Sequence, residues 1–302
     1  MGYVAVPVPM LDATNTVVTI LFMVLPIVAL FFGAGHEWDI KFAIAVVIVG
    51  VLFHVGGTEL VKMAEGPVAK GVLRAAAQAG LVTWCMGAGA ALATLLKDRN
   101  MLLPIAAFLA LFDMWLVFAP EGFVQKAMSG GNAPISLEAA AYAIPRMFSD
   151  SAQDAAIAKG YASDLAFVGP ADLLFLGMFF VALYKFQMRP KETFRAIAPV
   201  LVIYLAIVLK FPDVWLGPIR LSALPALLPI GITVLWVNRK EFKLLPDERA
   251  ITIGLLALGI PFVIWRIIVS QPGPEPIPPP PSVVWSPPFD KSEKDLFRDY
   301  KF

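Results

Sequence analysis

The sequence predicts an all-α, polytopic integral membrane protein with about eight transmembrane helices. Composition is the first reason: hydrophobic residues make up 59% of the 302 residues and charged residues 16%, and the mean hydropathy is +0.75. A soluble domain has about 45–50% apolar and about 25% charged residues, so this chain cannot cover its surface with polar groups. The second reason is a series of apolar runs of about 17–25 residues, the length that crosses a bilayer core.

The runs follow one another along the whole chain, separated by short polar and basic segments. Backbone polar groups cannot stay unpaired in lipid, so each run is expected to form a helix. The eight predicted spans are 16–35, 41–58, 73–96, 101–119, 165–184, 194–211, 219–237 and 250–269.

Four regions are predicted. Residues 1–119 hold the N-terminal membrane helices, and residues 120–164 form an extramembrane connection with short amphipathic helices expected at 136–144 and 152–158. Residues 165–270 hold the remaining membrane helices. Residues 271–302 are rich in proline and charge, and this composition is typical of a flexible, polyproline-like tail.

Basic residues in the connections indicate the orientation. Eight Lys and Arg residues lie on the N-terminal side and eleven on the other side, where the connections are shorter. The positive-inside rule then predicts a multi-pass protein of the cell membrane, with its N-terminus outside and the connections 185–195 and 239–249 in the cytoplasm.

Several partners and cofactors are disfavoured by composition. The net charge of +1 gives no reason to expect nucleic acid as a partner. The single cysteine, Cys85, excludes an internal disulfide and a cysteine-built metal site. The expected partners are the lipid bilayer and other transmembrane segments, and accessory subunits are left open.

Two aspartates lie inside predicted spans, at Asp113 and Asp172. A carboxylate near the middle of a span costs about 2.5–3.5 kcal/mol on insertion scales, so each one needs a reason. Helical rise places both about 9–10 Å from the same membrane face, because one connection joins the two spans. Matched depth predicts a facing pair.

A lone membrane aspartate often pairs with a lysine or caps a broken helix. Two neighbouring carboxylates cannot both ionise easily, so they share a proton and titrate as one unit. Aspartic proteases use that arrangement: one carboxylate activates water and the other donates a proton to the scissile carbonyl. Further along, Pro225 is expected to loosen a helix at the same depth.

The order of these elements resembles presenilins and signal peptide peptidases. The matching residues are Asp113, Gly169-Pro-Ala-Asp172 and Pro225-Ala-Leu227. The resemblance implies a presenilin-like core and intramembrane aspartyl proteolysis, in which Asp113, Asp172 and an activated water hydrolyse a transmembrane substrate helix without a metal or organic cofactor. The residues implied in substrate binding are Gly169, Pro170, Ala171, Pro225, Ala226 and Leu227. Either the segment before Asp172, acting as a strand, or backbone groups freed around Pro225 would bind the unwound substrate.

The sequence also departs from the family. Ala171 stands where the motif has glycine, and Phe112 stands where the family often has tyrosine. Three predicted spans precede the Asp113 span where the family has five, and one extra span follows Leu227. The resemblance covers about residues 101–237.

Other interpretations remain open. A site-2-type metalloprotease requires a His-Glu-x-x-His run, which is absent from the sequence. A rhomboid-type protease requires a membrane histidine as base, and His54 is expected instead to be a satisfied helix-packing residue. Prepilin peptidases lack the Pro-Ala-Leu element. A non-catalytic relative of the peptidases and an ion- or proton-coupled transporter that uses the same carboxylates are the two alternatives.

Overall fold

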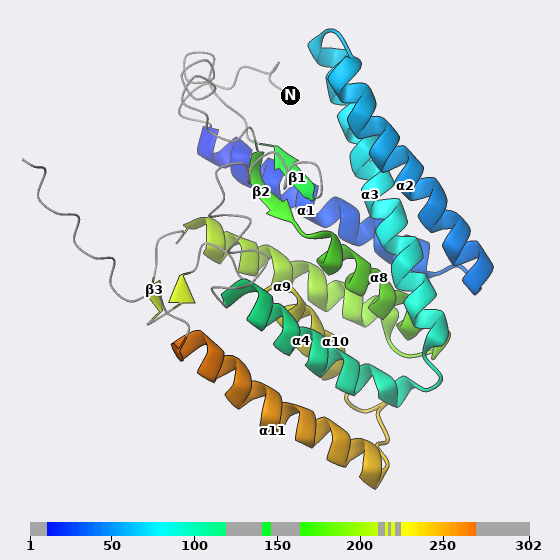
Figure 1. The fold of residues 1–302 in the computed structure, drawn as a ribbon, viewed down its shortest axis with the longest axis vertical. Coiled ribbons are helices and arrows are strands. Elements are labelled where there is room, and N and C mark those ends of the chain that lie inside the picture. The colour runs from blue at the N-terminus through cyan, green and yellow to red at the C-terminus, as the bar shows by residue number, and fades with distance from the viewer. Residues whose placement is uncertain are drawn as a thin grey trace, which may run out of the picture. The chain divides into compact units, whose positions relative to one another are not determined.

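The computed structural model describes residues 11–118, 141–145, 164–210, 215–216, 219–220 and 225–269. The chain divides into a compact unit, residues 1–270, and a second unit, 271–302. The predicted tail therefore lies outside the described residues. Figure 1 shows the described α-helices of the first unit, which are α1 (Leu11–Ala34), α2 (Ile40–Met63), α3 (Pro67–Leu95), α4 (Leu102–Phe118), α8 (Pro170–Lys185), α9 (Pro190–Lys210), α10 (Leu227–Asn238) and α11 (Pro246–Val269).

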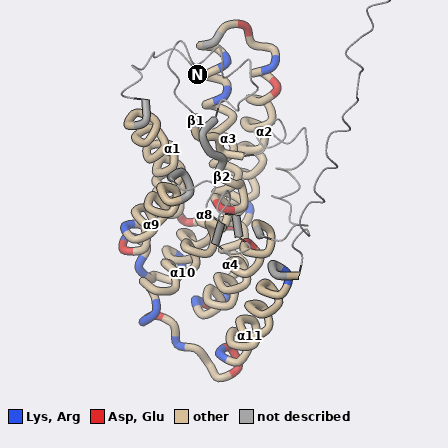
Figure 2. Tube along the Cα trace, turned by 90° about the vertical axis from the view of Figure 1, so that its left-hand side faces the viewer, with Lys and Arg blue, Asp and Glu red and all other residues tan. Residues whose placement is uncertain are grey.

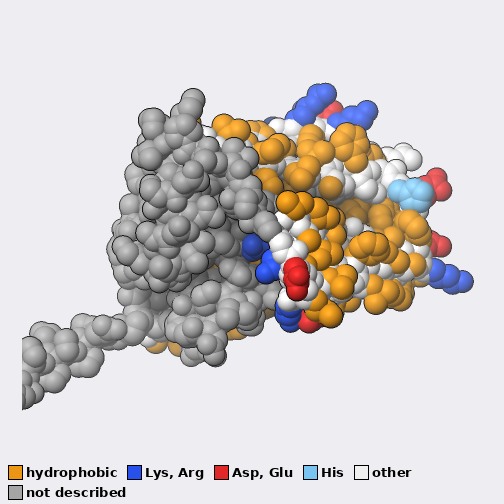
Figure 3. All heavy atoms as spheres, turned by 90° about the horizontal axis from the view of Figure 1, so that it is seen from above, with side chains coloured by type: hydrophobic (Ala, Val, Ile, Leu, Met, Phe, Trp, Pro, Cys, Tyr) orange, Lys and Arg blue, Asp and Glu red, His pale blue; other side chains and the backbone are white. Residues whose placement is uncertain are grey.

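Five of these segments are long and apolar enough to cross a membrane: Ala13–Ala34, Ile40–Met63, Val68–Leu95, Arg99–Val117 and Pro246–Arg266. Large hydrophobic side chains such as Phe32 and Leu52 are exposed on them, as expected of surfaces that face lipid. Figure 3 shows hydrophobic side chains over much of the visible described surface. The prediction of a helical, multi-pass membrane protein is confirmed at this level.

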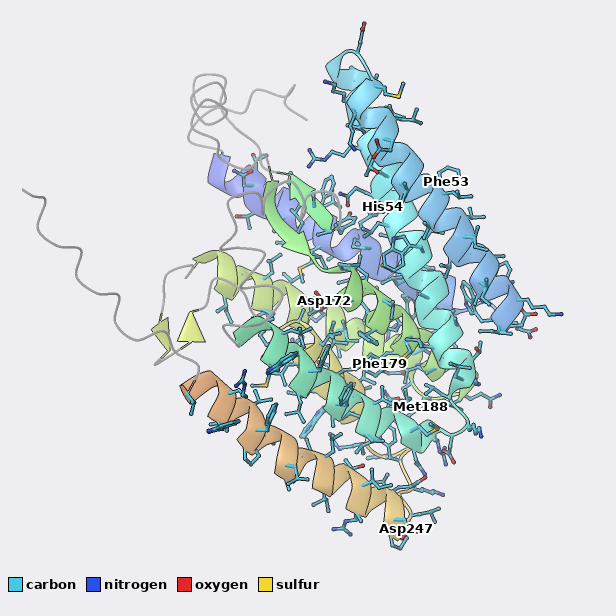
Figure 4. All side chains as sticks on the ribbon, in the orientation of Figure 1. Phe53, His54, Asp172, Phe179, Met188 and Asp247 are labelled. Carbon is cyan, nitrogen blue, oxygen red and sulfur yellow. The ribbon has the colours of Figure 1, made fainter. Side chains whose placement is uncertain are left out.

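Helices α2 and α3 pack closely along glycines that lie seven residues apart on each helix, Gly50 and Gly57 on α2 and Gly80 and Gly87 on α3. A Cβ atom on Gly80 would lie 2.5 Å from the backbone nitrogen of His54, so only glycine permits this approach. The Nδ1 of His54, which is labelled in Figure 4, hydrogen-bonds the Ala77 carbonyl at 3.0 Å between α2 and α3. The expectation that His54 is a helix-packing residue is confirmed.

Helix α8 is the most buried helix of the described core. Phe179, Phe180 and Leu183 are fully buried, and α8 packs on α1 and α3. At its C-terminal end, Lys185 donates from Nζ to three carbonyl oxygens that end α3, at 2.7–3.1 Å. This cation satisfies acceptors that a helix end leaves unpaired. The position of α8 against α3 is thus fixed at this end.

Two predicted helical segments are strands. Strand β1 (Tyr142–Pro145) pairs antiparallel with β2 (Asp164–Val168), with Tyr142 opposite Val168. The predicted amphipathic helix 136–144 is therefore wrong over residues 142–144, and the predicted span 165–184 is wrong over residues 165–168.

Pairing and burial explain this difference. The ladder satisfies backbone groups that a helix would otherwise pair, and Ala143 also donates its N–H to Oε1 of Gln78 on α3 at 3.2 Å. Residues 141–144 are buried, and β1 contacts α1 and α3. The second predicted amphipathic helix, 152–158, lies outside the described residues.

The predicted span 219–237 also begins too early. Residues 215–216 and 219–220 form a small antiparallel pair, β3 (Trp215–Leu216) and β4 (Ile219–Arg220), and α10 begins only at Leu227. Pro225 disfavours helical backbone at the residue before it. Pro229 is the third residue of α10, where a missing N–H breaks no helical hydrogen bond. Pro225 therefore precedes the helix and does not kink it.

Polar side chains join the connections between helices at one end of the protein. Asn100, just before α4, donates to the Lys243 carbonyl at 2.9 Å and to the Glu248 carboxylate at 3.0 Å. Arg189 forms an ion pair with Glu241 at 3.2 Å. These contacts place the connections before α4, after α8 and after α10 at one end of the helices, in agreement with the predicted sidedness. Figure 2 shows charged residues gathered mainly at the helix ends.

Candidate active site

Asp113 lies on α4, five residues before the helix ends at Phe118, and its side chain is buried. Its Oδ2 accepts a hydrogen bond of 2.7 Å from the backbone N–H of Leu227. Leu227 is both the last residue of the Pro-Ala-Leu sequence and the first residue of α10. The structure therefore joins two of the three sequence motifs directly.

This contact makes Asp113 the cap of α10. Ala226 at the N-cap position offers no side-chain hydrogen bond, so the first N–H groups of α10 depend on an acceptor from elsewhere. A carboxylate at a helix N-terminus is stabilised by hydrogen bonding and by the helix dipole. Capping of a broken helix, one of the two ordinary roles expected for a lone membrane aspartate, is what Asp113 does here.

Asp172 lies in the first turn of α8, directly after β2 (Figure 4). Gly169 is the N-cap, and its N–H donates back to the Asp172 carboxyl group, in the manner of a capping box. A Cβ on Gly169 would lie 3.2 Å from Oδ2 of Asp172, so glycine leaves this carboxyl group room to turn back. The expectation that Asp172 lies seven residues into a helix is wrong, because the preceding residues are extended.

The two carboxyl groups lie close enough to interact electrostatically, although they come from α4 and α8. Neither forms an ion pair with a lysine or arginine in the part of the chain that the structure describes. A lysine partner, the other ordinary role, is therefore not found among the described residues. What the geometry provides is an interacting pair of carboxyl groups, each next to the N-terminus of a helix.

Tyr204 on α9 is a site residue that the sequence analysis missed. Its hydroxyl donates to the Pro225 carbonyl at 2.8 Å, and both aspartates interact electrostatically with it. The hydrogen bond holds Pro225, just before α10, against α9. A signal was present in the sequence, because Tyr204 is the one polar side chain in the run 199–208.

Cys85 on α3 is a further residue near the site that the sequence pattern does not indicate. It is fully buried, and its Sγ–H donates to the Pro170 carbonyl at 3.4 Å. The thiol therefore ties α3 to the start of α8, on the segment that carries Asp172.

The other predicted binding residues lie in two backbone segments, one before α8 and one before α10. Pro225 and Leu227 are buried, Gly169, Pro170 and Ala226 are half-buried, and Ala171 is exposed. The methyl group of Ala171 is thus not packed against the protein interior. Among the described residues, no group of three or more His, Cys, Asp or Glu side chains could hold a metal ion.

Fold and site together define a helical membrane protein with two interacting carboxyl groups beside two helix N-termini. No protein-family model, curated protein or solved structure matches the chain.

Proposed function

We propose that this protein is an intramembrane aspartyl protease with a presenilin-like catalytic core, in which Asp113 and Asp172 act as one unit. The observation that supports this most directly is the convergence of three distant segments. Asp113 binds the N–H of Leu227, and Asp172 interacts with Asp113 from the start of α8. These interactions connect motif residues spread over more than a hundred positions, which supports a single site.

The proposed chemistry needs only this pair and a water molecule. One carboxylate takes a proton from water as the water oxygen attacks the scissile carbonyl carbon, while the other carboxyl group donates its proton to the carbonyl oxygen. The resulting gem-diol intermediate breaks its C–N bond, and the leaving amine takes up the proton held by the first group. The second carboxylate takes a proton from a hydroxyl of the gem-diol as the new carbonyl forms, which restores the starting protonation of the pair. Two carboxyl groups that share one proton supply both roles.

The strand β2 offers a binding surface for the substrate. A transmembrane helix must unwind before it is cut, and its freed backbone groups then need new partners. One edge of β2 pairs with β1, and no described strand pairs with the other edge. Strand addition on that edge would lead the substrate toward Asp172, which lies four residues beyond the last residue of β2.

The short helices α8 and α10 fit this proposal. Their 16 and 12 residues fall below the roughly 20 that span a bilayer. Non-helical backbone at membrane depth is tolerated where it is covered by protein or lines a water-filled cavity. We propose eight spans, with α8 and α10 completed by the segments that form the site.

The direct test is cleavage in reconstituted vesicles. The full-length protein is mixed with a transmembrane peptide, and the products are identified by mass spectrometry. Cleavage within the apolar segment, blocked by a hydroxyl-bearing transition-state mimic, is the expected result. If no transmembrane peptide is cut and the mimic does not bind, the protein is not a protease. Proton-coupled uptake by the same vesicles would instead identify a transporter.

Tyr204→Phe is expected to lower the rate of cleavage about tenfold. The variant loses the hydrogen bond to the Pro225 carbonyl, so the segment before α10 is held less firmly, and a small misplacement of catalytic groups is costly. Stability should fall by only about 1 kcal/mol, the value of one hydrogen bond. Tyr184→Phe, which removes a phenol near the far end of α8, is the control. An equal effect of both substitutions on cleavage would contradict the role of Tyr204.

We propose that the N-terminus and residues 120–164 lie outside the cytoplasm. Single cysteines are introduced as Ser151→Cys and Lys243→Cys and treated on intact cells with a reagent that does not cross membranes. Labelling of Ser151→Cys alone is expected, because the more basic connections stay inside. Cys85 is fully buried and should add little background. Labelling of Lys243→Cys alone would reverse the orientation.

A further inference from the structure

Helices α4, α10 and α11 line a partly open, apolar cavity of about 360 Å³. Its volume lies within the range of about 300–1,000 Å³ that small-molecule pockets occupy. All of the lining residues are apolar or glycine, and they include Leu103, Ala107, Ala110, Met114, Gly231 and Ile260. A cavity of this character offers a ligand no hydrogen bond, so it favours hydrocarbon.

The cavity continues into a wider, open hollow of about 620 Å³ at the end of the same helices. Leu103, Ile232 and Leu235 line both spaces. The open hollow adds Arg239 and Arg249 together with Trp236. An apolar interior thus opens into a mouth that carries two cations.

The guanidinium group of Arg239 lies over the Trp236 ring, 4.3 Å from its centroid. Trp236 is itself exposed, as is typical of a tryptophan at the membrane–water interface. Among the described residues, neither Arg239 nor Arg249 forms an ion pair. Both cations are therefore available to a ligand.

Two of the acidic groups nearest in sequence, Glu241 and Glu248, are engaged elsewhere. Glu241 forms its ion pair with Arg189 at 3.2 Å. The Glu248 carboxylate accepts hydrogen bonds from Asn100 at 3.0 Å and from the N–H of Leu245 at 2.9 Å. These contacts hold both carboxylates in the polar network that joins the helix ends.

We propose that this cavity binds an anionic glycerophospholipid, with an acyl chain between α4, α10 and α11 and the headgroup phosphate on Arg239 and Arg249. The mouth lies at the ends of membrane helices, where headgroups are found, and basic pockets between such helices bind anionic headgroups. Arginine suits phosphate because its planar donors can form paired hydrogen bonds. The site is independent of proteolysis, since its residues do not include either aspartate.

Lipid selectivity of the solubilised full-length protein tests this proposal. Native mass spectrometry measures binding of dioleoylphosphatidylglycerol and of dioleoylphosphatidylcholine, which share their acyl chains and differ in net charge. We expect a preference of roughly twenty-five-fold for phosphatidylglycerol, because each of two cations contributes a factor of about five near an anionic headgroup. The double variant Arg239→Gln/Arg249→Gln should lose this preference.

The matched control is Arg195→Gln/Lys240→Gln, which removes two exposed cations from the same end of the protein without touching the cavity. It should keep the full preference. The proposal would be overturned if both double variants lost the preference for phosphatidylglycerol equally. It would also be overturned if the wild type bound the two lipids equally.

A second substitution tests the acyl-chain part. Ala107→Phe fills the cavity and should weaken binding of both lipids about tenfold, and Ala107→Leu serves if the melting temperature shows that phenylalanine is not accommodated. An unchanged affinity in the filled variant, together with competition by millimolar glycerol 3-phosphate, would show an anion site without an acyl chain. A change in oligomeric mass instead of lipid binding would show a protein interface. Either outcome contradicts the lipid proposal.

Discussion

Asp113→Asn and Asp172→Asn are each expected to reduce cleavage of a transmembrane peptide by roughly a thousandfold or more, since general acid–base catalysis contributes about 10²–10⁴ and both groups take part. The amide is nearly isosteric with the carboxylate but cannot take up the proton that the mechanism moves. Folding should persist, because the amide oxygen can still accept the N–H of Leu227 at position 113. Peptide cleavage and thermal unfolding are measured on the same preparations.

Asp113 needs a further control because it also caps α10. Asp113→Leu removes the acceptor and leaves the Leu227 N–H unpaired, which should cost about 1–3 kcal/mol of stability in addition to activity. Asp113→Asn should lose activity but keep its stability. Asp247→Asn, at the start of α11, changes a carboxylate away from the site and should affect neither.

Substantial cleavage by either asparagine variant would refute the proposal that Asp113 and Asp172 act as one catalytic unit. A different result is informative as well: if both variants fold but lose proton-coupled uptake, the carboxylates belong to a transporter. Helix capping without any activity in the wild type would favour a non-catalytic relative.

Gly89→Leu is expected to lower the free energy of unfolding by about 3 kcal/mol or more, the upper part of the range for overpacking. Gly89 lies where α3 crosses α8, and a Cβ there would overlap the Leu174 carbonyl oxygen and lie 2.7 Å from the Met178 nitrogen. These are backbone atoms, so the two helices must separate. The stability is measured by denaturation in mixed micelles.

Gly56→Leu and Gly254→Leu are the controls, since a Cβ at either position meets no atom within 4 Å beyond its own turns of helix. Both should be neutral or slightly stabilising, because glycine costs about 1 kcal/mol in a helix. Because α8 carries Asp172, Gly89→Leu should also weaken binding of a transition-state mimic. A loss of stability no larger than that of the controls would show that the α3–α8 contact can relax freely.

The helices could be predicted from the sequence because the bilayer sets a simple rule. Every backbone N–H must be paired in lipid, so an apolar run of sufficient length forms a helix whatever its neighbours are. Each of the eight predicted runs overlaps a described helix, from α1 to α11. The two costly carboxylates could be identified for the same reason, since charge stands out in an apolar run.

The helix starts next to the site could not be predicted in the same way. Residues 165–168 are as apolar as the helix that follows, but they form β2 because β1 from a distant connection pairs with them. Near α10, the sequence contains Pro225 and Pro229, but it does not indicate where the helix begins relative to them. That start depends on the acceptor that caps the Leu227 N–H. Apolar character alone does not separate a buried strand from a helix.

The sequence by itself determined that this is a helical membrane protein and that Asp113, Asp172 and the Pro-Ala-Leu segment are unusual within it. Tertiary structure alone decided that Asp113 caps α10, that Tyr204 holds the Pro225 carbonyl and that Cys85 holds the Pro170 carbonyl. The physical reason is the range of the interactions. Lipid acts on every residue of a run at once and so leaves a pattern in the sequence, whereas the hydrogen bond from Leu227 to Asp113 joins residues 114 positions apart and depends on how the helices pack.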